Sequence, residues 1–298
     1  KGAIMRTLNI DIETFSSVDI GKSGAYKYAM SDDFQILLFA YSVDGQDVKI
    51  VDLAQGEAIP QEVLALLKDE KCTKYAYNAV FEWWCLNMAG IETPLEQWQC
   101  TMVHGLYCGY TAGLAAIGNA MGLPQDKKKL TTGSALIRYF CIPCNPTKSN
   151  GNRTRNLPQH APEKWELFKE YCVQDVVTEM EIGRRLSAFP VPDREWKLWV
   201  LDTFMNAYGV RIDSELVNGA LYIDALSRAN LLEEAREITK LDNPNSTSQL
   251  LNWLEEAGEE VENLQKATVE KMVDTLEDGK AKRVLEIRQE LSKTSVKK

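Results

Sequence analysis

Long apolar runs are missing from this sequence of 298 residues, and none approaches the roughly 18 residues that a membrane-spanning helix requires. No leader with a charged start, an apolar middle and a small-residue cleavage site opens the chain, so we expect a cytoplasmic protein with no membrane partner. The apolar fraction of 45% is nevertheless that of a globular protein, and the length suffices for one large or two ordinary domains.

Histidine is scarce, with two residues, and the seven cysteines are odd in number and lie mostly in apolar segments. We therefore expect reduced thiols that serve as small core residues, and no disulfide framework. Cys141 and Cys144 have the spacing of half a zinc site, but no second cysteine pair follows and neither His104 nor His160 lies at zinc-finger spacing. Zinc is therefore disfavoured.

An excess of basic residues is also missing, because the net charge is -9, and this argues against nonspecific coating of nucleic acid. The charge is uneven, however, since residues 277–298 carry seven basic and four acidic residues. This predicted helical end could face phosphate, with Lys293 and Lys297 as candidate contacts. It could equally be a solvated helix with intrahelical ion pairs, and charge alone leaves both readings open.

The first 190 residues have the pattern of an α/β domain. Residues 5–13 alternate apolar and polar side chains, and the segments 36–43 and 47–52 flank the turn Asp44-Gly45, so three antiparallel strands are predicted to open the fold. Further strands are predicted at 74–77 and 97–100, with helices at 60–69 and 79–88 and several short helices within 101–140.

A proline-rich, polar stretch at 143–162 predicts a long loop, in which Arg153 and Arg155 could clamp a phosphate. A helix to about residue 187 follows. Pro190 and Pro192 then mark the predicted boundary between a domain at 1–190 and an all-helical region at 191–298. Amphipathic spacing predicts the helices of this second region at 193–207, 213–240, 246–257, 266–276 and 279–293.

Asp11 and Glu13 share the polar face of the first predicted strand with Asn9, since residues two apart on a strand stand side by side, about 7 Å between α-carbons. Two carboxylates held this close repel unless a cation lies between them, and oxygen ligands favour Mg²⁺ or Mn²⁺. An isolated pair of this kind is more often a solvated strand end, so the pair alone is a weak signal.

Two other acidic residues have ordinary explanations when each is taken alone. Asn78 is predicted to cap the helix at 79–88, which puts Glu82 in its first turn, where the helix dipole favours a carboxylate. Tyr171 and Asp175 are four residues apart and share one helix face, as a buried tyrosine and a surface aspartate also would.

Together, in this order, these segments resemble the three sequence blocks of the 3'-5' exonuclease domain of polymerase I-like (family A) DNA polymerases, members of the DEDD exonuclease superfamily. The blocks are a D-x-E on a strand at 11–13, an N-x-x-[FY]-[DE] at a strand-to-helix junction at 78–82, and a Y-x-x-x-D on a later helix at 171–175.

Phage-type polymerases are the most similar members, through the sequences at 11–14, 78–82, 136–140 and 171–176. The similarity continues beyond residue 190, because the segments 209–213, 246–254 and 284–293 resemble the stretch that leads from the exonuclease domain into the polymerase thumb. The resemblance thus covers nearly the whole chain. It implies a ribonuclease H-like mixed sheet of about five strands flanked by helices, followed by an incomplete helical thumb.

The resemblance also implies a two-metal site that holds Mg²⁺, with Mn²⁺ able to substitute. Asp11 would bind both ions, Glu13 and Asp175 would complete the first site, and Glu82 would hold the second. The family usually has aspartate at the position of Glu82, so metal affinity is the property that this departure affects.

The remaining site residues follow from the same resemblance. Tyr171 would orient the attacking water, which assigns the chain to the tyrosine subclass (DEDDy), because the sister subclass has histidine where Glu170 stands. Thr14, Asn78 and Phe81 would contact the substrate, whose bases stack on apolar or aromatic side chains.

The implied function is 3'-5' proofreading, the hydrolysis of phosphodiester bonds at single-stranded DNA 3' ends. Its partners would be primer-template DNA and the palm and fingers of a phage or prophage polymerase in a bacterial host. Those parts have no counterpart in this sequence, so we expect no polymerisation from the chain alone. Two alternatives remain open: an RNase D-like exoribonuclease, and a nonenzymatic DNA-binding or scaffold module with vestigial acids.

Overall fold

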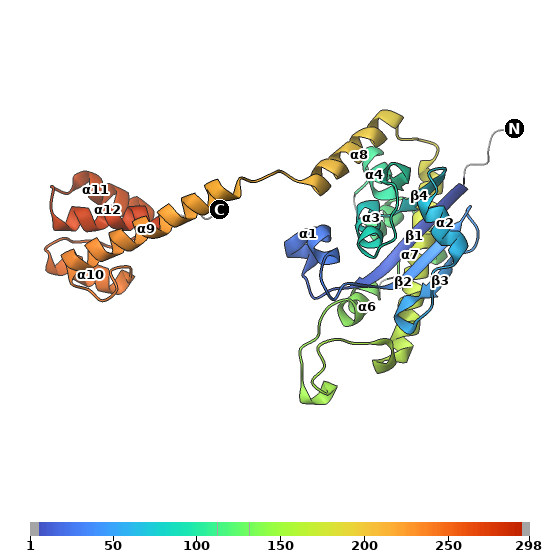
Figure 1. Cartoon of the computed structure of the whole chain (residues 1–298), viewed down its shortest axis with the longest axis horizontal. Coiled ribbons are helices and arrows are strands. Elements are labelled where there is room, and N and C mark those ends of the chain that lie inside the picture. Colours follow the sequence, from blue (N-terminus) through green and yellow to red (C-terminus); the bar gives the residue numbers. More distant parts are fainter. Residues whose placement is uncertain (1–5, 112, 131, 294–298) are drawn as a thin grey trace. The chain divides into compact units, whose positions relative to one another are not determined.

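The computed structural model describes residues 6–111, 113–130 and 132–293, and the chain forms two compact units, Lys1–Gly209 and Val210–Lys298 (Figure 1). A five-stranded sheet is the centre of the first unit, in the order β3-β2-β1-β4-β5. Its strands are β1 (Arg6–Phe15), β2 (Gln35–Val43), β3 (Lys49–Asp52), β4 (Cys72–Ala76) and β5 (Trp98–Cys100).

The first three strands are antiparallel, whereas β4 runs parallel to β1 and β5 parallel to β4. A mixed sheet of this order and these directions, flanked by helices, is the ribonuclease H-like arrangement, so the predicted fold class is confirmed. The predicted hairpin is present as well, with Asp44 and Gly45 in left-handed conformations between β2 and β3.

The alternation of β1 separates the two faces of the sheet. Leu8, Ile10 and Ile12 are buried in one core, together with residues of the helices α2 (Gln61–Lys68) and α3 (Ala79–Met88). Because side chains alternate along a strand, the odd-numbered residues of β1 face the other side. The register of β1 on β2 shifts directly after Glu13, which pairs with Leu38 whereas Thr14 pairs with Ile36.

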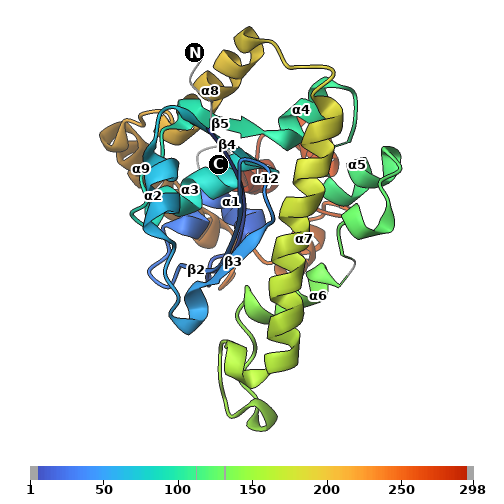
Figure 2. The same cartoon turned by 90° about the vertical axis from the view of Figure 1, so that its right-hand side faces the viewer.

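Helix α7 (Pro162–Leu186) packs on that other face (Figure 2). Trp165 and Phe168 of α7 lie in a second core with Leu38 of β2 and Phe140 of α6 (Gly133–Phe140). The polar side chains of β1 therefore lie beneath α7, and the residues on the facing side of α7 are the ones that they contact.

Between these elements, the structure confirms short helices in the region 101–140: α4 (Thr101–Tyr107), α5 (Leu114–Ala120) and α6. Helix α1 (Ile20–Ala29) was not predicted, and it is interrupted at Gly24, whose φ is 76°. The stretch at 143–162 has only two short 3₁₀ turns, Lys148–Asn150 and Pro158–His160.

Helix α8 (Asp193–Tyr208) belongs to the first unit, because Trp196 and Trp199 pack against the first core. The units therefore divide after Gly209, not at the boundary of 190 and 191 that the prolines predicted. Proline interrupts a helix, but it does not prevent the next helix from returning to the same core. That the two units are an exonuclease domain and a partial thumb stays a prediction.

The second unit contains only helices among its described residues: α9 (Ser214–Thr239), α10 (Thr247–Glu256), α11 (Lys266–Thr275) and α12 (Lys280–Ser292). Its core includes Leu250, Leu254, Val269 and Leu285. In the described part of the chain, no helix is both long and apolar enough to cross a membrane.

Candidate metal centre

Carboxylates from three elements converge where β1 passes beneath α7. Ligand atoms of Asp11 and Glu13 on β1 and of Cys172 on α7 all lie within 4.8 Å of one another. Asp175 follows Cys172 by one turn of α7, and Glu82 in the first turn of α3 is close enough to Asp11 to shift its own pKa. We call four of these residues the carboxylate cluster: Asp11, Glu13, Glu82 and Asp175.

The cluster carries more negative charge than its neighbour Lys129 compensates, although that ammonium lowers the pKa of both Asp11 and Glu13. Burial raises the pKa of Asp11 and of Glu13 well above their usual ranges, and the charge of a neighbouring carboxylate raises each further, Asp175 for Asp11 and Asp11 for Glu13. Burial and then Asp11 likewise raise the pKa of Glu82. The ionised cluster is therefore costly until positive charge joins it.

Two oxygens of the cluster are also without hydrogen-bond partners. Among the described residues, the buried side-chain polar atoms without a partner are Glu82 Oε2, Asp175 Oδ1 and Arg155 Nε. A buried carboxylate normally collects hydrogen bonds, so oxygens left open beside other carboxylates fit the ligand set of a hard cation. The residues present thus fit divalent metal ions.

Tyr171 lies one turn before Asp175 and is almost fully buried. Its side chain interacts with that of Asp175, and its pKa is raised above the usual range by burial and by the charge of Asp175, so the hydroxyl keeps its proton. Gly133 at the start of α6 makes room for the ring, because a Cβ at Gly133 would lie 2.0 Å from Tyr171 Cε2.

Lys129 is the residue of this centre that the sequence did not reveal. Its ammonium forms an ion pair with Asp175 Oδ2 and lies 4.6 Å from the centre of the Tyr171 ring. The two partners are 46 residues apart, and the only local signal is a run of three lysines at 127–129.

The predicted substrate contacts have mixed environments. Thr14 is buried and its hydroxyl shares a hydrogen bond of 2.8 Å with that of Tyr28, while the Phe81 ring lies 6.0 Å from the Tyr28 ring. Asn78 is exposed at the start of α3 in a left-handed conformation, and its side chain makes no capping bond. Asn78 thus stands at the predicted N-cap position, but the capping hydrogen bond that was predicted from its side chain is wrong.

The predicted phosphate contacts already have protein partners. Arg153 donates to Asn156 Oδ1 at 2.8 Å, and Arg155 donates to Gln35 Oε1 at 2.7 Å. Arg155 also lies over the Phe15 ring at 3.8 Å. Lys293 pairs with Glu290 at 2.6 Å, and Lys297 lies outside the described residues. Phosphate binding by these four residues stays a prediction.

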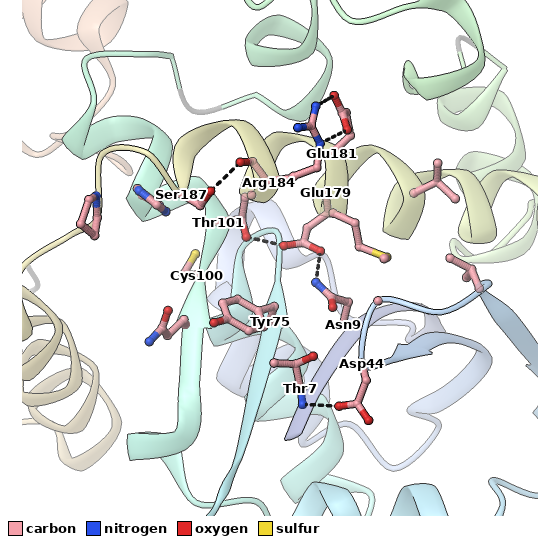
Figure 3. Close-up of a pocket in the computed structure, with 18 of the residues that line it drawn as sticks. Thr7, Asn9, Asp44, Tyr75, Cys100, Thr101, Glu179, Glu181, Arg184 and Ser187 are labelled. Atoms are coloured by element: carbon pink, nitrogen blue, oxygen red, sulfur yellow. Dashed lines mark hydrogen bonds and ion pairs between the residues drawn. The ribbon is translucent and has the colours of Figure 1, made fainter. Parts of the chain in front are cut away.

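A cavity of about 910 Å³ lies between the sheet, α7 and the start of α8. Figure 3 shows its floor, where Asn9 and Thr101 point toward the buried Glu179; Asn9 donates to Glu179 at 2.7 Å. No member of the carboxylate cluster lines this cavity. Glu179 has donors on both oxygens, so it lacks the open oxygens that mark Glu82 and Asp175 as candidate ligands.

Comparison with known proteins connects the chain to a polymerase. It is 50% identical over 295 residues to the DNA polymerase of Bacillus phage SP02, a match that covers 99% of this chain and 45% of that protein. The chain thus spans less than half the length of this relative. The predicted resemblance to phage-type DNA polymerases is confirmed, although no protein-family model matches the chain.

Two solved structures are similar at low identity. A nuclease in its apo form has a TM-score of 0.38 and 12% identity over 70% of this chain and 89% of its own. Trypanosoma brucei RNase D, in a GMP complex, has a TM-score of 0.39 and 17% identity over 63% of this chain and 52% of its own. Scores this low leave the fold assignment resting on the sheet order itself.

Proposed function

We propose that this chain, homologous over almost its whole length to part of a phage DNA polymerase, is a divalent-metal-dependent 3'-5' exonuclease that shortens single-stranded DNA from its 3' end. The observation that carries the proposal is that ligand atoms of β1 and α7 lie within 4.8 Å of one another, while Glu82 of α3 and Asp175 of α7, which interact electrostatically with Asp11, each have a buried oxygen without a partner. Homology to a DNA polymerase supports DNA as the substrate and proofreading as the role.

The cluster would hold two ions, Mg²⁺ with Mn²⁺ as a substitute, through the assignment that the family implies. Asp11, which interacts electrostatically with each of the other members, would serve both ions, Glu13 and Asp175 would complete one site, and Glu82 would complete the other. Bound ions would supply Lewis acidity to the scissile phosphate and acidify the attacking water. The Oε2 atom of Glu82 has no hydrogen-bond partner, which supports its proposed use as a metal ligand.

Side chains around the cluster have roles that do not depend on the ions. The Tyr171 hydroxyl stays protonated and can hold a water beside Asp175 by donating or accepting a hydrogen bond. Asn78 has an exposed amide at the start of α3, and Phe81 lies one residue before Glu82, so both are proposed to contact the terminal nucleotide. An unstacked base would gain by packing on the Phe81 ring.

Hydrolysis of an end-labelled single-stranded DNA by the purified chain tests this proposal. Asp11→Ala and Asp175→Ala should each lower the rate by about 100-fold or more, since even residues that only support a metal ligand typically contribute 10–100-fold. Glu62→Gln, on the exposed side of α2, is the matched control and should retain the rate. Full activity of either aspartate variant would refute the site.

Two further measurements on the same purified chain test the two alternative functions. Faster hydrolysis of RNA than of DNA of the same sequence would favour an RNase D-like exoribonuclease, because the 2'-hydroxyl is the feature that separates the substrates. Calorimetric titration with Mn²⁺ that shows no binding would favour a nonenzymatic DNA-binding or scaffold module.

The surface of the second unit is evidence for a partner, which we propose is the palm and fingers of a polymerase. Large apolar side chains point to several sides of the first half of α9 and stay exposed: Leu216 is 71%, Tyr222 69% and Ile223 66% exposed. Exposed apolar side chains gathered on one segment are typical of a surface that another polypeptide covers. The matched relative has more than half its length outside the match, and we propose that the equivalent polypeptide covers this helix.

Hydrogen exchange tests this partner. Amides at 216–226 should exchange faster in this chain alone than when the chain is joined to the polypeptide that corresponds to the rest of the relative. Equal exchange in the two proteins would contradict the proposed contact. Nucleotide addition is expected only of the joined protein.

A further inference from the structure

We propose that Lys129 is a tethered cation of the carboxylate cluster, which neutralises Asp175 while no divalent ion is bound and is displaced toward the substrate phosphate when ions bind. This inference rests on the proposed exonuclease function. It assigns a role to a lysine outside the motifs that identified the site, and to Gln174, which none of the assigned roles uses.

The position of the ammonium is the first argument. Lys129 pairs with Asp175 Oδ2, and the side chains of the pair are 26% and 6% exposed, so water and salt screen the interaction only partly. The same ammonium lies over the Tyr171 ring. It therefore contacts both the last acidic residue of the site and the proposed water-orienting tyrosine.

The second argument is how the lysine is held there. Gln174 Nε2 donates to the backbone oxygens of Asp126 at 3.0 Å and Lys128 at 3.1 Å. One amide on α7 thus fixes the backbone immediately before Lys129, and the next residue of α7, Asp175, receives its ammonium. Gln174 is in this sense a positioning residue.

The third argument is charge. Asp175 has one oxygen paired with Lys129 and one buried oxygen without a hydrogen-bond partner, and it belongs to a cluster that fits divalent ions. A divalent ion at that oxygen would repel the neighbouring ammonium. The flexible four-carbon stem lets the ammonium leave, and the scissile phosphate is the anion that would receive it beside Tyr171.

Replacing Lys129 with an uncharged residue should change metal affinity and turnover in opposite directions, and this distinguishes the proposed role from a structural one. Loss of the charge removes a competitor from Asp175, so metal should bind more tightly. Loss of the charge also removes a contact to the phosphate, so turnover should be slower. A lysine that only supports the fold would weaken both properties when replaced.

The test measures Mn²⁺ binding by calorimetry and single-stranded DNA hydrolysis for Lys129→Gln and Gln174→Ala. Lys129→Gln should bind Mn²⁺ about tenfold more tightly, since a like charge at such a site changes an equilibrium by that order. Its kcat should fall about 100-fold, the usual cost of losing a donor to the developing charge. Gln174→Ala should shift both quantities in the same directions by less.

Lys127→Gln is the matched control, because it removes the same charge from the same segment, and both of its values should stay those of the unchanged protein. Lys129→Gln with unchanged or weaker Mn²⁺ binding, in a protein that melts as a folded chain, would overturn the role of Lys129. The proposed function fails separately, if the unchanged protein neither binds Mn²⁺ nor shortens DNA.

Discussion

Glu82→Gln should make the metal-free protein more stable while it impairs the metal site. Glu82 is 4% exposed, its Oε2 has no hydrogen-bond partner, and burial and then Asp11 raise its pKa. The ionised side chain is therefore a cost to the fold in the absence of ions. Glutamine keeps the shape, removes the charge and can donate to a neighbouring carboxylate.

The size of the effect follows from the burial of this group. A buried polar group without a partner costs about 1–3 kcal/mol. Each unit by which folding raises a carboxyl pKa removes about 1.4 kcal/mol of stability once the group is ionised. We expect a gain of about 1–2 kcal/mol in the free energy of unfolding, and about 2–4 °C in Tm for each kcal/mol in a unit of this size.

Thermal unfolding at mildly alkaline pH, once in chelator and once in excess Mn²⁺, measures both the stability of the metal-free protein and the stabilisation by metal. Glu82→Gln should melt higher than the unchanged protein in chelator, gain less from Mn²⁺, and hydrolyse single-stranded DNA about 100-fold more slowly. Glu62→Gln, which loses only a favourable charge in the first turn of α2, should melt no higher than the unchanged protein in chelator and should keep its gain from Mn²⁺ and its hydrolysis rate. A folded Glu82→Gln protein that melts no higher in chelator would refute the account of Glu82 as an uncompensated buried charge.

The other predictions concern pH and Tyr171. Because folding raises the pKa of Glu82, its contribution to stability falls as the pH rises from its unfolded value of about 4 through the folded value. The Tm advantage of Glu82→Gln in chelator should therefore grow across that window, and a constant difference would contradict the sign. Gly133→Ala should displace Tyr171, whose Cζ would lie 2.4 Å from the new Cβ, and slow hydrolysis about 100-fold with Mn²⁺ binding retained. Gly113→Ala, whose Cβ would meet Ala116 at 3.6 Å, is the control, and equal rates for the two variants would contradict the tyrosine role.

Local patterns in the sequence predicted most of the fold. Alternation in β1, the Asp44-Gly45 turn and the amphipathic spacing of the later helices each depend on neighbouring residues alone. Helix α1 was not predicted because Gly24 interrupts it, and because its buried residues, Tyr28 and Ala29, are confined to its end. The compact units divide after Gly209, beyond the predicted boundary, because the packing of Trp196 depends on a core formed far away in the sequence.

The candidate site was predictable only in part for the same reason. Strand periodicity alone puts Asp11 and Glu13 together, whereas Glu82 and Asp175 joined them in the prediction through family resemblance. Lys129 belongs to no periodic pattern, and the three consecutive lysines do not show which of them turns inward. That selection is made by Gln174, because its two hydrogen bonds fix the backbone just before Lys129.

Helix α7 is therefore more than the support for one metal ligand. Tyr171, Asp175 and Glu179 recur at four-residue intervals, which puts them on one face of the helix, toward β1. Glu179 is tied to Asn9 of β1, and Gln174 is tied to the backbone before Lys129. A shift of α7 along the sheet would move the tyrosine, the aspartate and the lysine together. Substitutions at Gln174 should consequently alter metal affinity and turnover without touching any carboxylate.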